Sequence, residues 1–186
     1  MNLLRLISRF ILTLLGWKLL DLPQRPDKAV VVAYPHTSNW DFPLALLYLA
    51  ATRLNARWVG KDTMFRGWRG PILRKLGGVP VNRRERTGFV ERVVDIFNQN
   101  EKFNLLIATE GTRRRQDGWK SGFYRIAIAA KAPVLLSTMD YKKKEMGLIA
   151  CIELTGDETA DMARIAACYE GRQGYRHENA SPVKLL

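Results

Sequence analysis

Two side chains that could move a proton, His36 and Asp41, lie five positions apart near the start of the chain. An unperturbed histidine titrates near pH ~6.5, which suits a general base. On one continuous helix this spacing would place the two residues about 140° apart, on different faces. They can meet only if His36 lies in a turn before the helix, where Asp41 could accept a ring N–H and stabilise the imidazolium. Alternatively, Asp41 only complements the helix dipole at the N-terminus.

A second polar group, Glu110-Gly-Thr-Arg113, follows a predicted strand at residues 103–108. Gly111 permits an unusual backbone angle, and Arg113 can bind a phosphate through two parallel hydrogen bonds. Arg83 follows another predicted strand and could do the same. Either arginine alone could be a solvated surface charge, but two at neighbouring strand ends favour a phosphate pocket. We expect Glu110 to order a nearby arginine or backbone N–H.

These residues sit in a pattern of alternating strands and helices. Predicted strands cover residues 29–34, 57–60, 79–82, 103–108, 133–139 and 147–154, and predicted helices cover 41–53, 65–75, 87–100, 123–131 and 159–170. We expect the tail from residue 171 to be weakly structured. The alternation predicts an α/β fold with a mainly parallel central sheet flanked by helices. Such sheets bind ligands beyond the carboxyl ends of their strands, where His36, Asp41, Arg83 and Glu110 are expected.

The first twenty residues predict an amphipathic helix. Arg5, Arg9 and Thr13 fall on one narrow face, and large apolar residues cover the remainder. The longest run without a charge, residues 10–17, is far short of the ~20 residues that a spanning helix needs. We therefore expect residues 1–22 to lie in the membrane interface as an anchor and residues 27–186 to form one α/β domain. The alternative is a helix packed on the protein's own core.

The bulk composition narrows the class of partner. The 30 lysines and arginines against 18 acidic residues give a net charge of +12, which favours nucleic acid, an anionic membrane or an acidic carrier protein. Basic residues around 66–86 could dock acidic headgroups or such a carrier. The chain has no Walker loop, GxGxxG or GxSxG motif, and its two scattered histidines predict no metal site. Its two cysteines show no CxxC spacing, so we expect reduced thiols.

Four blocks in order resemble the glycerolipid acyltransferase family, which includes the lysophosphatidic acid acyltransferases. His36-Thr-Ser-Asn-Trp-Asp41 is similar to the His-x-x-x-x-Asp motif of that family. Gly78-Val-Pro-Val-Asn-Arg83, Glu110-Gly-Thr-Arg113 with the following Trp119-Lys-Ser-Gly122, and Ala132-Pro-Val-Leu-Leu136 are similar to the later blocks. Ala108-Thr109 stands where the family usually has Phe-Pro, and Pro80 stands where apolar or aromatic residues are common.

The resemblance implies a membrane-associated enzyme that moves a fatty acyl group from acyl-CoA or acyl-carrier protein to a lipid hydroxyl. It implies His36 and Asp41 as catalytic residues. The substrate-binding residues that it implies are Arg83, Glu110, Gly111, Thr112, Arg113 and Lys120. We expect 1-acylglycerol-3-phosphate as the acceptor, no cofactor beyond the acyl donor, and a place on the cytoplasmic face of the cell membrane.

Three alternatives differ in acceptor or in chemistry. One is another lysolipid acceptor, such as lyso-ornithine lipid, and the second is a basic nucleic-acid-binding module without catalysis. The third is a non-catalytic membrane adaptor. The apolar N-terminus and the lack of a basic–aromatic motif argue against nucleic acid. No feature of the sequence predicts an oligomeric state.

Overall fold

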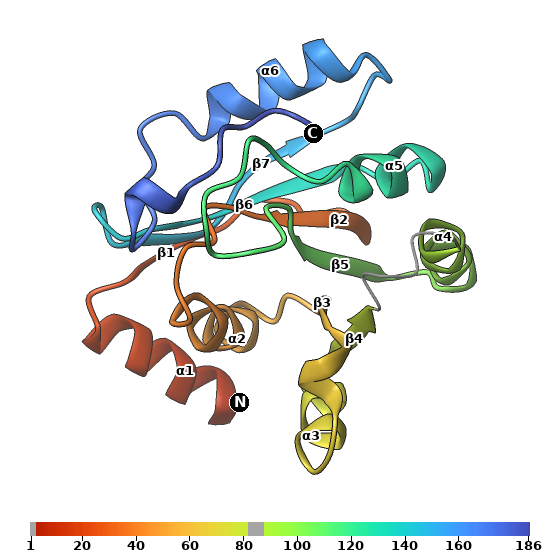
Figure 1. The fold of residues 1–186 in the computed structure, drawn as a ribbon. Coiled ribbons are helices and arrows are strands. Elements are labelled where there is room, and N and C mark those ends of the chain that lie inside the picture. Colours follow the sequence, from red (N-terminus) through yellow and green to blue (C-terminus); the bar gives the residue numbers. More distant parts are fainter. Residues whose placement is uncertain (1–2, 82–87) are drawn as a thin grey trace.

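The computed structural model describes residues 3–81 and 88–186, and Figure 1 shows their arrangement. The strands are β1 (Lys18–Leu20), β2 (Lys28–Ala33), β3 (Ala56–Lys61), β4 (Gly78–Val81), β5 (Phe103–Ala108), β6 (Val134–Asp140) and β7 (Glu145–Ile152). The α-helices are α1 (Leu3–Leu14), α2 (Asp41–Thr52), α3 (Arg69–Lys75), α4 (Phe89–Gln99), α5 (Gly122–Ala129) and α6 (Glu158–Cys168). Short 3₁₀ turns are η1 (Asp62–Phe65) and η2 (His177–Asn179).

The seven strands form one sheet in the order β1-β7-β6-β2-β5-β3-β4. Every neighbouring pair is parallel except β6 and β7, which form an antiparallel hairpin. Strand β2 is the middle strand, and its successive side chains point to opposite faces of the sheet. Val30 and Val32 therefore belong to one hydrophobic cluster, and Ala29 and Val31 belong to the other. The predicted α/β class with a mainly parallel sheet is confirmed.

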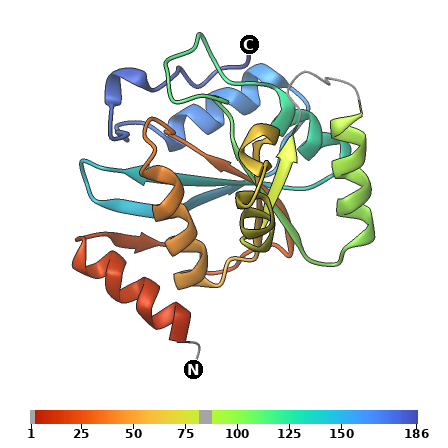
Figure 2. The same cartoon turned by 60° about the horizontal axis from the view of Figure 1, so that its bottom comes forward.

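Helices cover both faces of this sheet (Figures 1 and 2). α4, α5 and α6 lie on one face, and α2 lies on the other with α1 beside it. The sequence of α2, DFPLALLYLAAT, is apolar on all sides, as expected for a helix packed between two layers. The sheet covers one side of α2 and α1 packs beside it, which completes a second core around Leu12, Tyr48 and Leu135.

The N-terminal helix is shorter than its sequence predicts. It ends at Leu14 because Gly16 adopts a left-handed φ of 76°, and Trp17 N–H donates to the Leu12 carbonyl at 2.8 Å. The chain then forms β1, which extends the sheet by pairing with β7. The predicted helix to residue 20 is therefore wrong at its end, and the segment from Lys18 to Leu20 is built into the α/β sheet.

The C-terminal tail is packed against the body of the protein, so the prediction of a weakly structured tail is wrong. Ser181 is buried, its carbonyl accepts a hydrogen bond from Tyr34, and Leu185 forms a bridge with Trp119. The tail crosses the same edge of the sheet as the loops after β2 and β5 (Figure 1). Its polar composition conceals this packing because most of the contacts use backbone groups, which sequence patterns do not report.

Candidate active site

The central strands bring two of the predicted polar groups to one place. β2 and β5 are parallel neighbours, with Ala33 paired to Ala108 at their carboxyl ends. His36 follows the first of these residues by three positions, and Glu110 follows the second by two. The register of the sheet alone therefore sets the two loops side by side.

His36 and Asp41 meet in the way that the spacing requires. His36 lies in the turn before α2, Asp41 is the first residue of that helix, and His36 Nδ1 is 3.1 Å from Asp41 Oδ2. The backbone N–H groups of Thr37 and Ser38 donate to the same oxygen, each at 2.9 Å. The carboxylate thus shapes the turn that returns the imidazole toward it. Asp41 is buried, whereas the His36 side chain keeps 19% of its surface exposed, so the ring is accessible to a substrate.

Glu110 is a buried brace between two segments. Its Oε2 accepts the backbone N–H of His36 at 2.7 Å, and its Oε1 accepts that of Ser181 at 2.8 Å. Burial raises the pKa of Glu110, although hydrogen bonds from Ser181 and His36 partly oppose that rise. The expected role of ordering a backbone N–H fits this geometry, and Glu110 does not line the cavity described below.

The residues after Glu110 lie at the entrance of the site. Gly111 has a φ of 67°, and a Cβ added there would lie 3.0 Å from Lys120 Cε, so the position suits glycine on both counts. Lys120 is exposed and packs over that glycine. Thr112 and Arg113 line the same cavity as His36, and Arg113 is exposed to solvent.

The proposed partner of Arg113 at a phosphate site is Arg83. Arg83 lies outside the described residues, so the structure gives no position for its side chain. Arg83 follows β4, and β3 lies between β4 and β5 in the sheet. The expectation that the two arginines follow neighbouring strands is therefore wrong, because sheet order does not follow sequence order here.

A cavity of about 610 Å³ opens beside the imidazole. His36, Asn39, Thr112 and Arg113 supply polar groups to its wall, and most of the remaining lining is apolar. The apolar lining includes Phe42, Leu49, Leu54, Trp58, Met64, Leu106, Met139 and Met146. A volume of this size with few polar groups suits a flexible apolar ligand whose reactive end reaches the histidine.

Backbone N–H groups in the His36 turn and at Gly111 are near enough to the site to be considered as donors to a tetrahedral oxyanion, but they are already engaged. The N–H groups of His36, Thr37 and Ser38 donate to Glu110 and Asp41, and that of Gly111 donates to the Ala108 carbonyl at 3.0 Å. In the described geometry these four N–H groups do not point at a substrate, because the carboxylates of Glu110 and Asp41 and the Ala108 carbonyl accept them.

Tyr141, which follows β6, is a further residue of the site that the sequence did not predict. Its hydroxyl donates to Asp41 Oδ1 at 2.7 Å, on the oxygen that does not face His36. Burial and this hydrogen bond raise the pKa of Tyr141 well above its ordinary value, so the phenol remains a donor at neutral pH. The sequence held a signal for this residue, because Tyr141 closely follows the predicted strand at residues 133–139. In the structure β6 is parallel to β2, so it ends at the same edge of the sheet.

A sequence model of the family described as Acyltransferase matches residues 20–139, well over half of the 186 residues. The chain belongs to the acyltransferase family. As an acyltransferase, it is an enzyme, and the matched region holds His36, Asp41 and Glu110 together with most of the residues that line the cavity.

The fold of this acyltransferase also has a counterpart among solved structures. It is similar to the 1-acyl-sn-glycerophosphate (LPA) acyltransferase PlsC from Thermotoga maritima, with a TM-score of 0.58 and 18% sequence identity. The match covers 90% of this chain and 76% of that one. A search of curated protein sequences gave no match. The structural likeness confirms the predicted acyltransferase-like fold of this chain.

Proposed function

We propose that this acyltransferase moves a fatty acyl group from acyl-CoA or acyl-carrier protein to the hydroxyl of 1-acylglycerol-3-phosphate, giving phosphatidic acid. The observation that carries the proposal is the His36–Asp41 pair at 3.1 Å beside a mostly apolar cavity with Arg113 at its wall. An apolar cavity suits the acyl chain, and a guanidinium suits the phosphate. The name of the T. maritima enzyme agrees with this acceptor.

The chemistry needs no covalent enzyme intermediate. His36 takes the proton of the acceptor hydroxyl through the ring nitrogen that does not face Asp41, while the oxygen bonds to the thioester carbonyl carbon. Asp41 stabilises the imidazolium that forms. The tetrahedral intermediate then expels the thiolate by breaking the C–S bond, and the thiolate takes the proton from His36. Asn39 and Thr112, in the cavity wall, carry side-chain donors for the oxyanion.

Arg113 and Lys120 would hold the acceptor phosphate at the entrance. Both are exposed cations beside Gly111, and Arg83 is the further candidate from the sequence. Arg113→Ala should raise KM for a phosphorylated acceptor by about tenfold or more while changing kcat less, because binding of the phosphate positions the hydroxyl. An unchanged KM would argue against Arg113 as a phosphate ligand.

The acceptor is tested by mass spectrometry of products from the purified full-length protein supplied with mixed acyl donors and a panel of lysolipids. We expect phosphatidic acid as the main product. Acylation of lyso-ornithine lipid in preference to lysophosphatidic acid would overturn the acceptor assignment and support the alternative. Duplex DNA binding without any acyl transfer would overturn the enzyme mechanism altogether.

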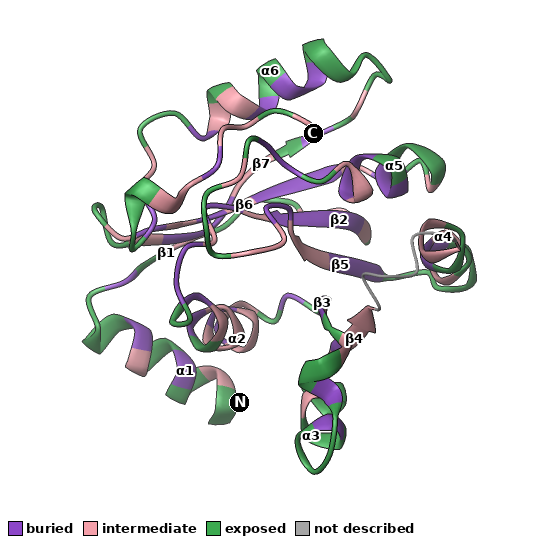
Figure 3. Cartoon of the chain, in the orientation of Figure 1, coloured by how far each residue is buried: buried purple, intermediate pink, exposed green. Residues whose placement is uncertain are grey.

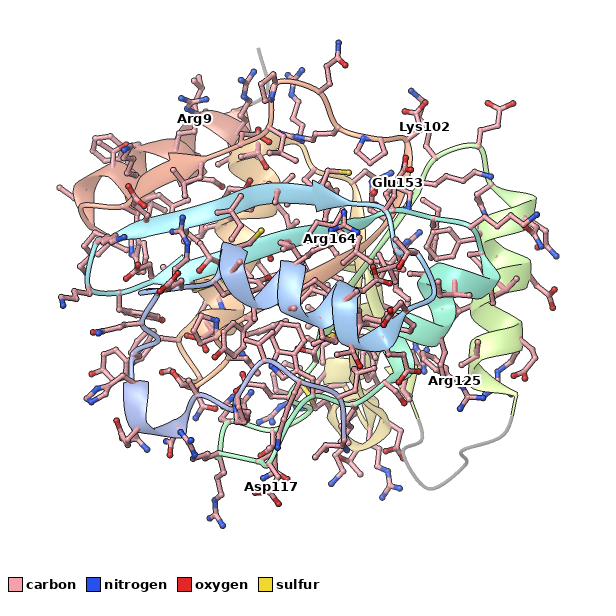
Figure 4. The ribbon with its side chains drawn as sticks, turned by 90° about the horizontal axis from the view of Figure 1, so that it is seen from above. Arg9, Lys102, Asp117, Arg125, Glu153 and Arg164 are labelled. Carbon is pink, nitrogen blue, oxygen red and sulfur yellow. The ribbon has the colours of Figure 1, made fainter. Side chains whose placement is uncertain are left out.

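We also propose that α1 holds the protein on the cytoplasmic face of the cell membrane. Within the described residues, 3–81 and 88–186, no helix is long and apolar enough to cross a bilayer. Ser8 and Leu12 are buried, and Arg5 donates to the Ala51 carbonyl of α2. The outer side of the helix exposes the apolar residues Leu3, Leu4, Leu6, Ile7, Phe10 and Leu14 (Figure 3), and Arg9 projects at the surface (Figure 4).

An apolar outer face with flanking arginines suits an interfacial helix. Replacing Leu3, Phe10 and Leu14 by serine should therefore release the protein from anionic vesicles without lowering its thermal stability. Vesicle binding of this variant at the wild-type level would contradict the anchoring role of α1.

A further inference from the structure

A second exposed surface lies beside the cavity, on η1 and α3. It consists of the apolar Met64, Trp68, Ile72 and Leu76 with the basic Lys61, Arg66, Arg69, Arg74 and Lys75, and we call it the α3 face. Trp68 is 74% exposed, and Ile72 and Leu76 follow at intervals of four, which aligns all three on one side of the helix. Asp62 is the only acidic residue between Lys61 and Leu76, so the face is strongly basic.

The α3 face is fixed to the wall of the cavity. Phe65 is buried and stacks on Trp58 with ring centroids 5.6 Å apart, and Trp58 Nε1 donates to the Leu76 carbonyl at 2.8 Å. Gly70 allows α3 to pack closely, because a Cβ there would lie 2.2 Å from the Phe65 carbonyl oxygen. Lys61 and Met64 themselves line the cavity together with Trp58. Whatever binds the α3 face is therefore held next to the route into the active site.

The α3 face and the exposed side of α1 belong to the same half of the molecule. Both helices lie on the α2 side of the sheet, with α2 between them (Figures 1 and 2). α5 and α6 occupy the opposite side. A flat partner that contacts α1 could thus reach the α3 face as well.

We propose that the α3 face is a second membrane-docking surface, which sets the mouth of the cavity against an anionic bilayer. This inference rests on the proposed lipid function. Tryptophan and aliphatic side chains insert at the level of the headgroups, and the surrounding lysines and arginines meet anionic lipid phosphates. An acidic carrier protein would match the charges, but it would provide no comparable apolar layer for Trp68, Ile72 and Leu76 together. With two contacts, α1 and α3, an acyl chain can pass from the bilayer past Met64 into the cavity.

Vesicle binding tests the proposal without requiring acyl transfer. The full-length protein is co-sedimented with phosphatidylcholine vesicles containing phosphatidylglycerol, in parallel with a Trp68→Ser/Ile72→Ser variant. A matched control is Ile128→Ser, because Ile128 is 41% exposed on α5, on the other side of the sheet. We expect the double variant to lower the partition coefficient at least about tenfold, or about 1.4 kcal/mol, and the control to match the wild type. Equal binding of the double variant and the wild type would overturn the proposal.

A second measurement locates Trp68 itself. The variant Trp68→Phe keeps an apolar ring and should bind vesicles almost normally. Vesicles with brominated acyl chains should quench the fluorescence of the wild type more than that of Trp68→Phe, and equal quenching of the two would contradict insertion of Trp68. If the double variant binds vesicles normally but loses affinity for acyl-carrier protein, the α3 face serves the donor and the membrane assignment is wrong. If the wild-type protein binds vesicles through the α3 face but transfers no acyl group, the result counts against the proposed function alone.

Discussion

Asp41 receives hydrogen bonds on both carboxylate oxygens. Thr37 and Ser38 donate to Oδ2, which also faces His36, and Tyr141 donates to Oδ1. A buried carboxylate surrounded in this way is held in one rotamer, and its charge is stabilised without a full ion pair. Among these donors Tyr141 is the one far from Asp41 in sequence, because it lies just after β6. Its ring packs edge-on against Trp17 and Tyr175.

Tyr141→Phe tests whether this hydrogen bond positions Asp41 for catalysis. We expect kcat to fall about three- to tenfold, since the carboxylate loses one donor of typical net value ~1 kcal/mol. The acid limb of the pH–rate profile should move to higher pH, because a less stabilised carboxylate attracts the imidazole proton more strongly. Tyr175→Phe is the matched control: it keeps the ring contact with Tyr141 and makes no hydrogen bond to Asp41. Identical profiles for Tyr141→Phe and the wild type would remove the positioning role.

The C-terminal segment, residues 173–181, holds the catalytic loops together. Ser181 N–H donates to Glu110, whose other oxygen holds the N–H of His36. Arg176 N–H donates to the hydroxyl of Thr37, and Gln173 accepts the N–H of Tyr141. The segment therefore contacts the loops after β2, β5 and β6 at once.

Ser181→Pro removes the N–H that Glu110 accepts. Ala180 is already extended, with φ −68° and ψ 129°, which is the conformation that a residue before proline favours. We expect kcat to fall about tenfold as Glu110 and then His36 lose their fixed positions. Ser181→Ala keeps the N–H and loses the hydroxyl, which accepts the backbone N–H of Gln116 and also hydrogen-bonds to Glu110. Its kcat should therefore fall less than that of Ser181→Pro. If the two variants have the same kcat, the brace through Glu110 has no catalytic role.

A second buried carboxylate stabilises the α6 side of the fold. Asp161 is fully buried and accepts hydrogen bonds from Tyr124, Thr155 and Gly156. Burial alone would raise the pKa of Asp161, but these hydrogen bonds outweigh burial and lower it. A carboxyl group whose pKa is lower in the folded state stabilises the fold above its unfolded pKa of about 4, and this contribution disappears as pH falls through the folded value.

Asp161→Asn should therefore lower the free energy of unfolding at pH 7 by about 2–4 kcal/mol, because an amide cannot accept all of these donors. The difference from the wild type should shrink as the pH falls below about 4, because the carboxyl group of the unfolded wild type takes up a proton there and that of the folded protein does so only at lower pH. Urea unfolding at several pH values measures both effects. A difference that stays constant down to pH 2 would contradict the assignment to the carboxylate charge.

The sequence predicts much of the element pattern for identifiable reasons. Continuous β-branched runs such as AVVV mark the central strand, and Asp41 in the first turn of α2 fits both hypotheses for that residue. The end of α1, the strand β1 and the order of the sheet are set by contacts between distant segments, which periodicity does not record. In the site, His36, Asp41 and Glu110 were predicted because they follow strands. The brace from Ser181 was missed because it uses a backbone N–H.

For the whole molecule, the net charge of +12 and the two exposed apolar surfaces predict one behaviour on membranes. Basic residues near both surfaces should make vesicle binding stronger on anionic than on zwitterionic lipid. Raising the salt from 0.05 M to 0.5 M should weaken binding several-fold but leave a salt-resistant part from the apolar contacts. Sedimentation at both salt concentrations checks this, and complete release by salt would mean that the apolar surfaces do not insert.

The role of His36 as general base is tested by the initial rate of acyl transfer by His36→Ala in the purified full-length protein. The His36 side chain is partly exposed, so the variant should keep its thermal stability. If His36 is the general base, the rate with saturating donor and acceptor should fall by about 10²–10⁴-fold. A folded His36→Ala protein that transfers acyl groups within about tenfold of the wild-type rate would contradict the account.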